Sequence, residues 1–120
     1  MRVAGFGFRD GAEIAALRAA LAAAGGNIQA LAAVREKAET PVLRALAAEL
    51  GVELIALPVG LLRGVETITH SPRMLARFGT GSLAEAAALC AAGPGARLLG
   101  PRVSSPDRMA MAAIAERVRE

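Results

Sequence analysis

The segment directly before an alanine-rich stretch carries residues suited to anion binding. Residues 79–82, Gly-Thr-Gly-Ser, precede residues 83–92, whose composition predicts a helix. Glycines at a helix start leave backbone N–H groups accessible, and the helix dipole favours negative charge at that end. We therefore expect a ligand anion to be bound by the four residues of this segment: Gly79, Thr80, Gly81 and Ser82.

A second interpretation of the same segment is a helix cap. Ser82 and Glu85 have the spacing of a capping box, in which each side chain accepts a hydrogen bond from the other residue's backbone N–H. A glutamate engaged in this way is not free to act as a general base. The cap and the anion site do not exclude each other, because Gly79, Thr80 and Gly81 can still face a ligand.

The first predicted strand ends in another glycine-containing segment. Residues 5–11 read GFGFRDG, a spacing that differs from the G-x-G-x-x-G of dinucleotide-binding turns, so a dinucleotide site is not favoured. Ligands of open α/β sheets lie beyond the carboxyl ends of the strands, where Arg9 is expected to stand. Arg9 is therefore either an anion-binding residue or a solvated arginine that follows a strand.

Charges alternate in residues 35–40, REKAET, between a predicted strand and a predicted helix. Lys37 and Glu39 are candidates for a catalytic or binding pair, and a solvated loop is the competing interpretation. His70 and Ser71 are neighbours along the chain, which is a poor arrangement for a hydrolytic triad whose members must meet in space. Ser71 precedes a proline and is better suited to the N-cap of a helix.

Alternating strands and helices are expected to position these residues. The apolar pattern predicts strands at residues 2–8, 27–34, 52–58 and 96–100. It predicts helices from residue 10 or 11 to residue 24 and at 41–50, 71–79, 82–93 and 105–120, with a helical turn and a loop at 59–69. Three Ser/Thr–Pro pairs mark helix starts, and the inward face of the last helix is expected to carry Met111, Ile114 and Val118. We predict a single α/β domain, with a sheet of about four to five mostly parallel strands and helices on both faces.

Length and composition narrow the range of functions. The 120 residues suffice for one domain, and 54% of them are hydrophobic. The formal net charge of +3 comes without Trp or Tyr, so no stacking platform for nucleic acid accompanies the basic residues. No apolar run reaches the roughly 18 residues of a membrane span, and no secretory signal is visible, so we expect a cytoplasmic protein. The single cysteine argues against a disulfide framework, and no spacing of metal ligands is present, so neither a metal nor a cofactor is expected.

Three segments, taken in their order and spacing, resemble the CobE/CbiG C-terminal domain family of cobalamin biosynthesis. These segments are GFGFR after the first strand, REKAE after the second, and SPRMLARFGTGSLAEAAAL. The similarity runs from about Val3 to the last predicted helix, and the length is most similar to that of the stand-alone members. The resemblance implies a cytoplasmic α/β domain that binds or acts on a corrin or precorrin intermediate.

The resemblance also implies site residues by position. They are Gly5, Gly7, Arg9, Lys37, Glu39, Ser71, Gly79, Gly81, Ser82 and Glu85. Near its end the family usually has a lysine where this chain has Arg102, which keeps the positive charge. The acetate and propionate carboxylates of corrin precursors suit Arg9, Lys37 and the glycine-rich helix start. Three phenylalanines are candidates for an apolar floor beneath the ring, of which Phe6 is favoured as a core residue instead: Phe6, Phe8 and Phe78.

Three functions are compatible with this resemblance. The first is an accessory or carrier protein that binds a corrin intermediate without transforming it. The second is a hydrolase that opens a precorrin lactone ring, as the larger CbiG proteins do, with Lys37, Glu39 or Glu85 assisting the attack by water. The third is a structural partner that stabilises another enzyme of cobalamin biosynthesis.

Overall fold

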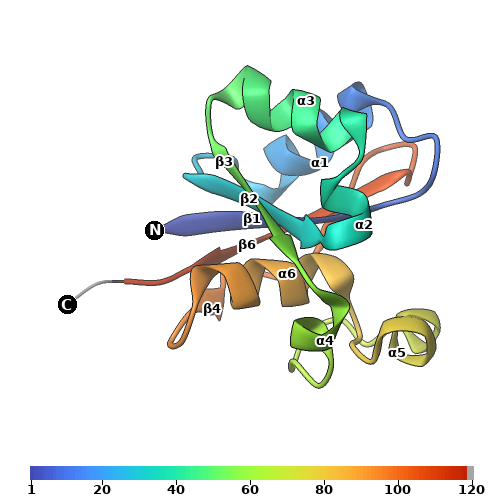
Figure 1. The fold of residues 1–120 in the computed structure, drawn as a ribbon, viewed down its shortest axis with the longest axis vertical. Coiled ribbons are helices and arrows are strands. Elements are labelled where there is room, and N and C mark those ends of the chain that lie inside the picture. The colour runs from blue at the N-terminus through green and yellow to red at the C-terminus, as the bar shows by residue number, and fades with distance from the viewer. Residues whose placement is uncertain (119–120) are drawn as a thin grey trace.

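The centre of the structure is a mixed β-sheet with helices packed against both faces (Figure 1). The computed structural model describes residues 1–118. The strands are β1 (Arg2–Phe8), β2 (Ala30–Val34), β3 (Glu53–Leu57), β4 (Arg97–Leu98), β5 (Val103–Ser104) and β6 (Ala110–Glu116). The helices are α1 (Ile14–Ala24), α2 (Arg35–Ala38), α3 (Pro41–Leu50), α4 (Val59–Leu62), α5 (Pro72–Phe78) and α6 (Leu83–Ala92).

The sheet is mixed, and its strand directions roughly fit the prediction of mostly parallel strands. Its strand order is β3-β2-β1-β6-β4, and β5 also pairs with β6. The pairs β1–β2 and β2–β3 are parallel, whereas β6 is antiparallel to β1, β4 and β5. In residues 1–118, therefore, five strands run in one direction and β6 alone runs in the other. The predicted α/β class is confirmed, and the strand count of the described residues rises to six because β5 and β6 are not among the four strands predicted from the sequence.

The prediction for the end of the chain is wrong. Residues 110–116 form the strand β6 rather than part of a helix, and residues 119 and 120 lie outside the described residues. Seven residues of β6 pair with β1, and its small alanine side chains let α1 and α6 pack on opposite faces. This environment outweighs the helix propensity of alanine. Ile114 is buried as expected, but Val118 is 69% exposed.

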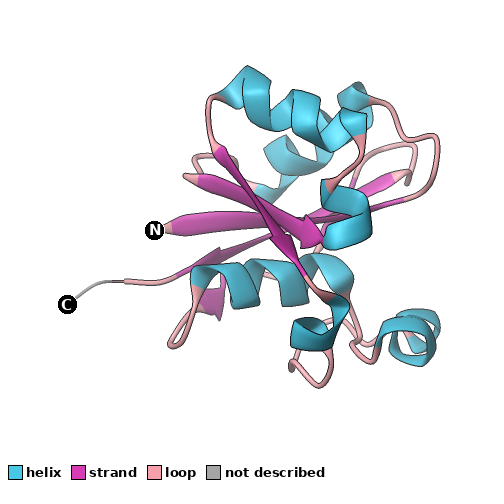
Figure 2. Cartoon of the chain, viewed as in Figure 1, coloured by secondary structure: helices cyan, strands magenta, loops and turns pink. Residues whose placement is uncertain are grey.

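Helices lie on both faces of the sheet (Figure 2), and a layer of apolar side chains packs against each face. In β1, Ala4 and Phe6 face the layer that contains α1 and α3, whereas Val3 faces the layer that contains α6. Side chains of a strand alternate between its faces, so the continuous apolar run of β1 serves both layers. All three of these β1 side chains are fully buried. Among the described residues, no helix combines the length and the apolar character that a membrane crossing requires.

The Ser/Thr–Pro pairs have three different outcomes. Ser71 is the N-cap of α5, and its Oγ accepts a hydrogen bond from the N–H of Met74. Thr40 occupies the N-cap position of α3, but its hydroxyl donates to the carbonyl of Lys37 instead. Ser105 starts no helix; it belongs to the turn between β5 and β6. Proline after a hydroxyl residue therefore marked two of the three predicted helix starts.

Candidate functional site

A cleft of about 600 Å³ opens at the carboxyl ends of β1 and β2. Its walls come from the residues after β1, from α2, from α5, from the start of α6 and from the β5–β6 turn. Ligand pockets in proteins commonly measure about 300–1,000 Å³. The cleft therefore has the size of a small-molecule site, and it lies where open α/β sheets usually bind their ligands.

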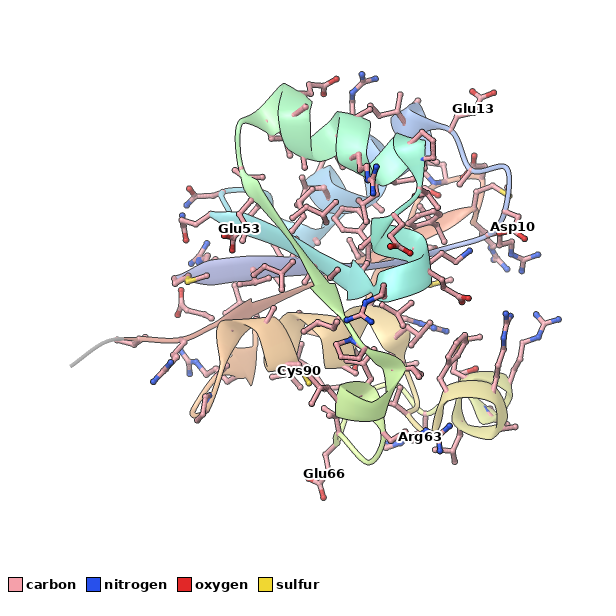
Figure 3. All side chains as sticks on the ribbon, in the orientation of Figure 1. Asp10, Glu13, Glu53, Arg63, Glu66 and Cys90 are labelled. Carbon is pink, nitrogen blue, oxygen red and sulfur yellow. The ribbon has the colours of Figure 1, made fainter. Side chains whose placement is uncertain are left out.

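Positive charge dominates the polar lining of this cleft. Six cationic side chains line it: Arg9, Lys37, Arg73, Arg77, Arg102 and Arg108. Two carboxylates, Asp10 and Glu36, share it with them. Figure 3 shows side chains that end in nitrogen rising from α5 toward the segment that carries Asp10. The excess of cations suits a ligand with several negative charges.

The cleft also has an apolar floor. It is formed by the side chains Phe8, Met74, Phe78, Leu83, Met109 and Met111. Phe8 and Phe78 were candidates for this role, whereas Phe6 is fully buried in the core between the sheet and α1. A cation lies over each of the two rings. Lys37 Nζ lies 5.0 Å from the centroid of the Phe8 ring, and Arg77 Cζ lies 4.8 Å from the centroid of the Phe78 ring.

Lys37 is the one candidate catalytic residue that lines the cleft. Its Nζ donates a hydrogen bond of 3.1 Å to Oδ1 of Asp10, and its side chain is 16% exposed. Glu39, the expected partner of Lys37, is exposed and does not line the cleft. Glu36 lines the cleft in its place, because residues 35–38 form a helical turn rather than a loop. The predicted pair of Lys37 and Glu39 is therefore corrected.

The glycine-rich segment at residues 79–82 packs against a neighbouring loop. A Cβ on Gly81 would lie 2.3 Å from the carbonyl oxygen of Thr69, and one on Gly79 would lie 3.0 Å from Cγ of Arg63. The hydroxyl of Thr80 donates to the carbonyl of Val65. Thr80 and Ser82 are buried, and the whole segment lies outside the cleft lining. We therefore revise the expected anion site: these residues pack the loop, and the cationic cleft lies beside them.

This packing predicts that Gly81→Ala destabilises the protein by about 2 kcal/mol, because the added methyl group collides with backbone of the loop. Gly100→Ala is the matched control, since nothing lies within 4 Å of the Cβ it would add. Urea unfolding of both variants measures the difference. A loss of stability equal to that of Gly100→Ala would contradict the packing role.

Glu85 is fully buried and engaged by other groups. Its carboxylate accepts hydrogen bonds from the N–H of Ile68 (2.6 Å), from the N–H and hydroxyl of Thr69, and from the N–H of Arg102 (2.9 Å). Burial would raise the pKa of Glu85, but the hydrogen bonds from Thr69, Arg102 and Ile68 together lower it below the ordinary value. Glu85 therefore holds two loops in place, and the expectation of a general base there is corrected.

The capping-box interpretation is half correct. Ser82 Oγ accepts a hydrogen bond of 3.2 Å from the N–H of Glu85, as the motif requires. The carboxylate does not return to Ser82, because four donors from the two loops occupy it. The motif thus specifies the start of α6, while the Glu85 side chain links that start to the two loops that contain Thr69 and Arg102.

Four of the expected site residues meet at the cleft: Gly7, Arg9, Lys37 and Ser71. Gly5 does not, because it is buried against α6, where a Cβ would lie 1.9 Å from the carbonyl oxygen of Ala84. Sequence reasoning missed Arg73 and Arg77, although two arginines four residues apart on one short helix share a face. It also missed Arg108, which belongs to the segment predicted to be helical.

Comparisons with known proteins agree with this architecture. The family model described as the cobalamin synthesis G C-terminus matches residues 2–115. The crystal structure of CobE, a protein from the cobalamin (vitamin B12) biosynthetic pathway, is similar with 34% sequence identity and a TM-score of 0.84, covering 100% of this chain and 92% of CobE. The cobalamin biosynthesis protein chiG from Agrobacterium tumefaciens str. C58 is similar with 36% identity and a TM-score of 0.74, covering 99% and 100% of the two chains. No curated protein sequence matches the chain significantly.

Proposed function

The chain belongs to the family of the cobalamin synthesis G C-terminus, and on that premise we propose that this protein of cobalamin biosynthesis binds a carboxylate-rich corrin-ring intermediate in its cleft. The observation that carries the proposal is the combination of six cationic side chains with an apolar floor. Corrin precursors present a large apolar ring with acetate and propionate carboxylates around it. The ring suits the floor, and guanidinium groups form charge-assisted, often bidentate hydrogen bonds with carboxylates.

A binding or carrier role fits the cleft better than hydrolysis. Of the three candidate catalytic residues, Glu85 is buried and saturated with donors, and Glu39 is exposed away from the cleft. Lys37 lines the cleft, but its amine is paired with Asp10 and lies over Phe8, an arrangement suited to holding a ligand. An open cleft also allows the ligand to pass to another enzyme of the pathway. We propose that both proteins are cytoplasmic.

An absorption titration with hydrogenobyrinic acid tests this function. We expect the parent protein to bind and Arg77→Ala to weaken the binding by roughly tenfold or more, because one charge-assisted contact contributes about 1.5–3 kcal/mol. Binding should also weaken as salt is added. Arg44→Ala is the matched control, since Arg44 is an exposed arginine of α3 outside the cleft lining.

Two results would reject the proposal. One is no binding by the parent protein at high micromolar ligand. The other is an equal loss of affinity in Arg77→Ala and Arg44→Ala, which would indicate a general charge effect rather than a site. The hydrolase alternative is tested with a lactone-bearing precorrin in place of hydrogenobyrinic acid: product formation that disappears in Lys37→Ala, with binding retained, would favour catalysis over carriage.

A further inference from the structure

The turn between β5 and β6 places an arginine in a conformation that favours glycine. Arg108 has φ +60°, and its N–H donates to the carbonyl of Ser105, closing a turn that contains Pro106. In such a connection the residue after the turn adopts the left-handed conformation and is typically glycine. A non-glycine L-amino acid is disfavoured there, because its Cβ approaches the following carbonyl.

The rest of the turn is built to hold this conformation. Ser105 is buried, and its Oγ donates to Oδ1 of Asp107 and accepts from the N–H of Ala110. Oδ1 of Asp107 also accepts from the N–H of Met109, and the N–H of Ser105 donates to the carbonyl of Ala110. These hydrogen bonds involve residues on both sides of Arg108 and do not use its guanidinium group. The turn therefore explains the backbone conformation but not the arginine side chain.

Asn27 and Arg108 both have a positive φ but differ in how well their residue types tolerate it. In residues 1–118 the non-glycine residues with positive φ are Asn27 and Arg108. Asparagine is among the residues that tolerate this conformation best, so Asn27 needs no further explanation. Arg108 lacks that tolerance, and its side chain lines the cationic cleft beside Met109. Backbone strain that a fold retains is concentrated at functional sites, where the side chain is needed.

We propose that Arg108 is an anchor for one carboxylate of the ligand, held over the cleft by a rigid turn at a cost in stability. This inference rests on the proposed function and names a residue that acts within it. Because the hydrogen-bonded turn fixes the backbone of Arg108 before the ligand arrives, less ordering accompanies binding. The planar guanidinium group can then form two parallel hydrogen bonds with a carboxylate.

The test combines two measurements on the same variants: thermal unfolding without ligand and absorption titration with hydrogenobyrinic acid. For Arg108→Gly we expect a melting temperature equal to that of the parent or higher by up to about 4 °C, with affinity reduced roughly tenfold or more. Arg108→Lys keeps the charge and the backbone strain, and should lose less affinity. Asn27→Gly relieves the same conformation outside the cleft and should leave affinity unchanged.

The outcomes separate this inference from the function on which it rests. If the parent and Arg108→Gly bind equally, the anchor role is wrong and the proposed function stands. If Arg108→Gly melts more than about 5 °C below the parent, the arginine stabilises the turn and the inference is overturned. If the parent does not bind hydrogenobyrinic acid, the proposed function fails and the anchor fails with it.

Discussion

Gly5→Ala should lower the free energy of unfolding by about 3 kcal/mol or more, whereas Gly7→Ala should change it by less than about 1 kcal/mol. Both glycines belong to β1 and lie two residues apart, so they share a face of the strand. A Cβ on Gly5 would lie 1.9 Å from the carbonyl oxygen of Ala84 and 2.6 Å from the nitrogen of Ala88. At Gly7 the nearest atom is 3.8 Å away, which is an ordinary contact.

The reason for the difference is the close approach of α6 to the sheet. The atoms that a methyl group at Gly5 would meet belong to the helix backbone and cannot rotate away, so α6 must shift as a whole. Denaturant unfolding of the two variants measures the contrast. Equal stability of Gly5→Ala and Gly7→Ala would show that α6 does not approach β1 in this way, and would assign Gly5 a role other than packing.

Replacing Glu85 should have an effect of similar size. Glu85→Ala leaves four part-buried donors from the two loops without their acceptor, and we expect a loss of about 3–5 kcal/mol. Glu85→Gln keeps one acceptor oxygen and should lose about 2 kcal/mol. Glu66→Gln is the control, because Glu66 is an exposed residue that points away from the body of the protein in Figure 3.

The same carboxylate predicts a dependence of stability on pH. The pKa of Glu85 in the folded protein is lowered, so the folded state binds a proton less readily than the unfolded chain does. Its contribution to stability is therefore complete well above the ordinary value of about 4.5 and is lost as the pH falls through the folded-state pKa. The difference in unfolding free energy between the parent and Glu85→Gln should shrink as the pH falls through the folded-state pKa of Glu85. A difference that stays constant down to acid pH would contradict this role.

The sequence predicts the first half of the fold well because its elements are locally determined. The apolar run of β1 is bounded by Arg2 and Arg9, and α3 has a proline at its start and Gly51 at its end. The strand β6 could not be predicted in this way. Its alanines favour a helix locally, and only the pairing with β1 and the helices on both faces make a strand more stable.

The candidate site, too, is only partly predictable from the sequence. Arg9 and Lys37 were predictable, since each follows the carboxyl end of a parallel strand. The partners of Glu85 were not, because they lie 16 or 17 residues away in both directions along the chain. A glycine that binds a ligand and a glycine that lets a loop approach also look alike in a sequence. Gly81 could be assigned only once its neighbours were known.

The central claim is that the ligand occupies the cationic cleft, and chemical-shift mapping of the backbone amides during titration with hydrogenobyrinic acid tests it most directly. We expect the shifts to concentrate in the four segments that supply most of the cleft lining, residues 7–10, 36–40, 71–78 and 108–111. The smaller groove at the amino ends of β2 and β3, which includes Asn27 and Val52, should remain unchanged and serves as an internal control. Shifts confined to that groove, or spread evenly over the surface, would contradict the claim.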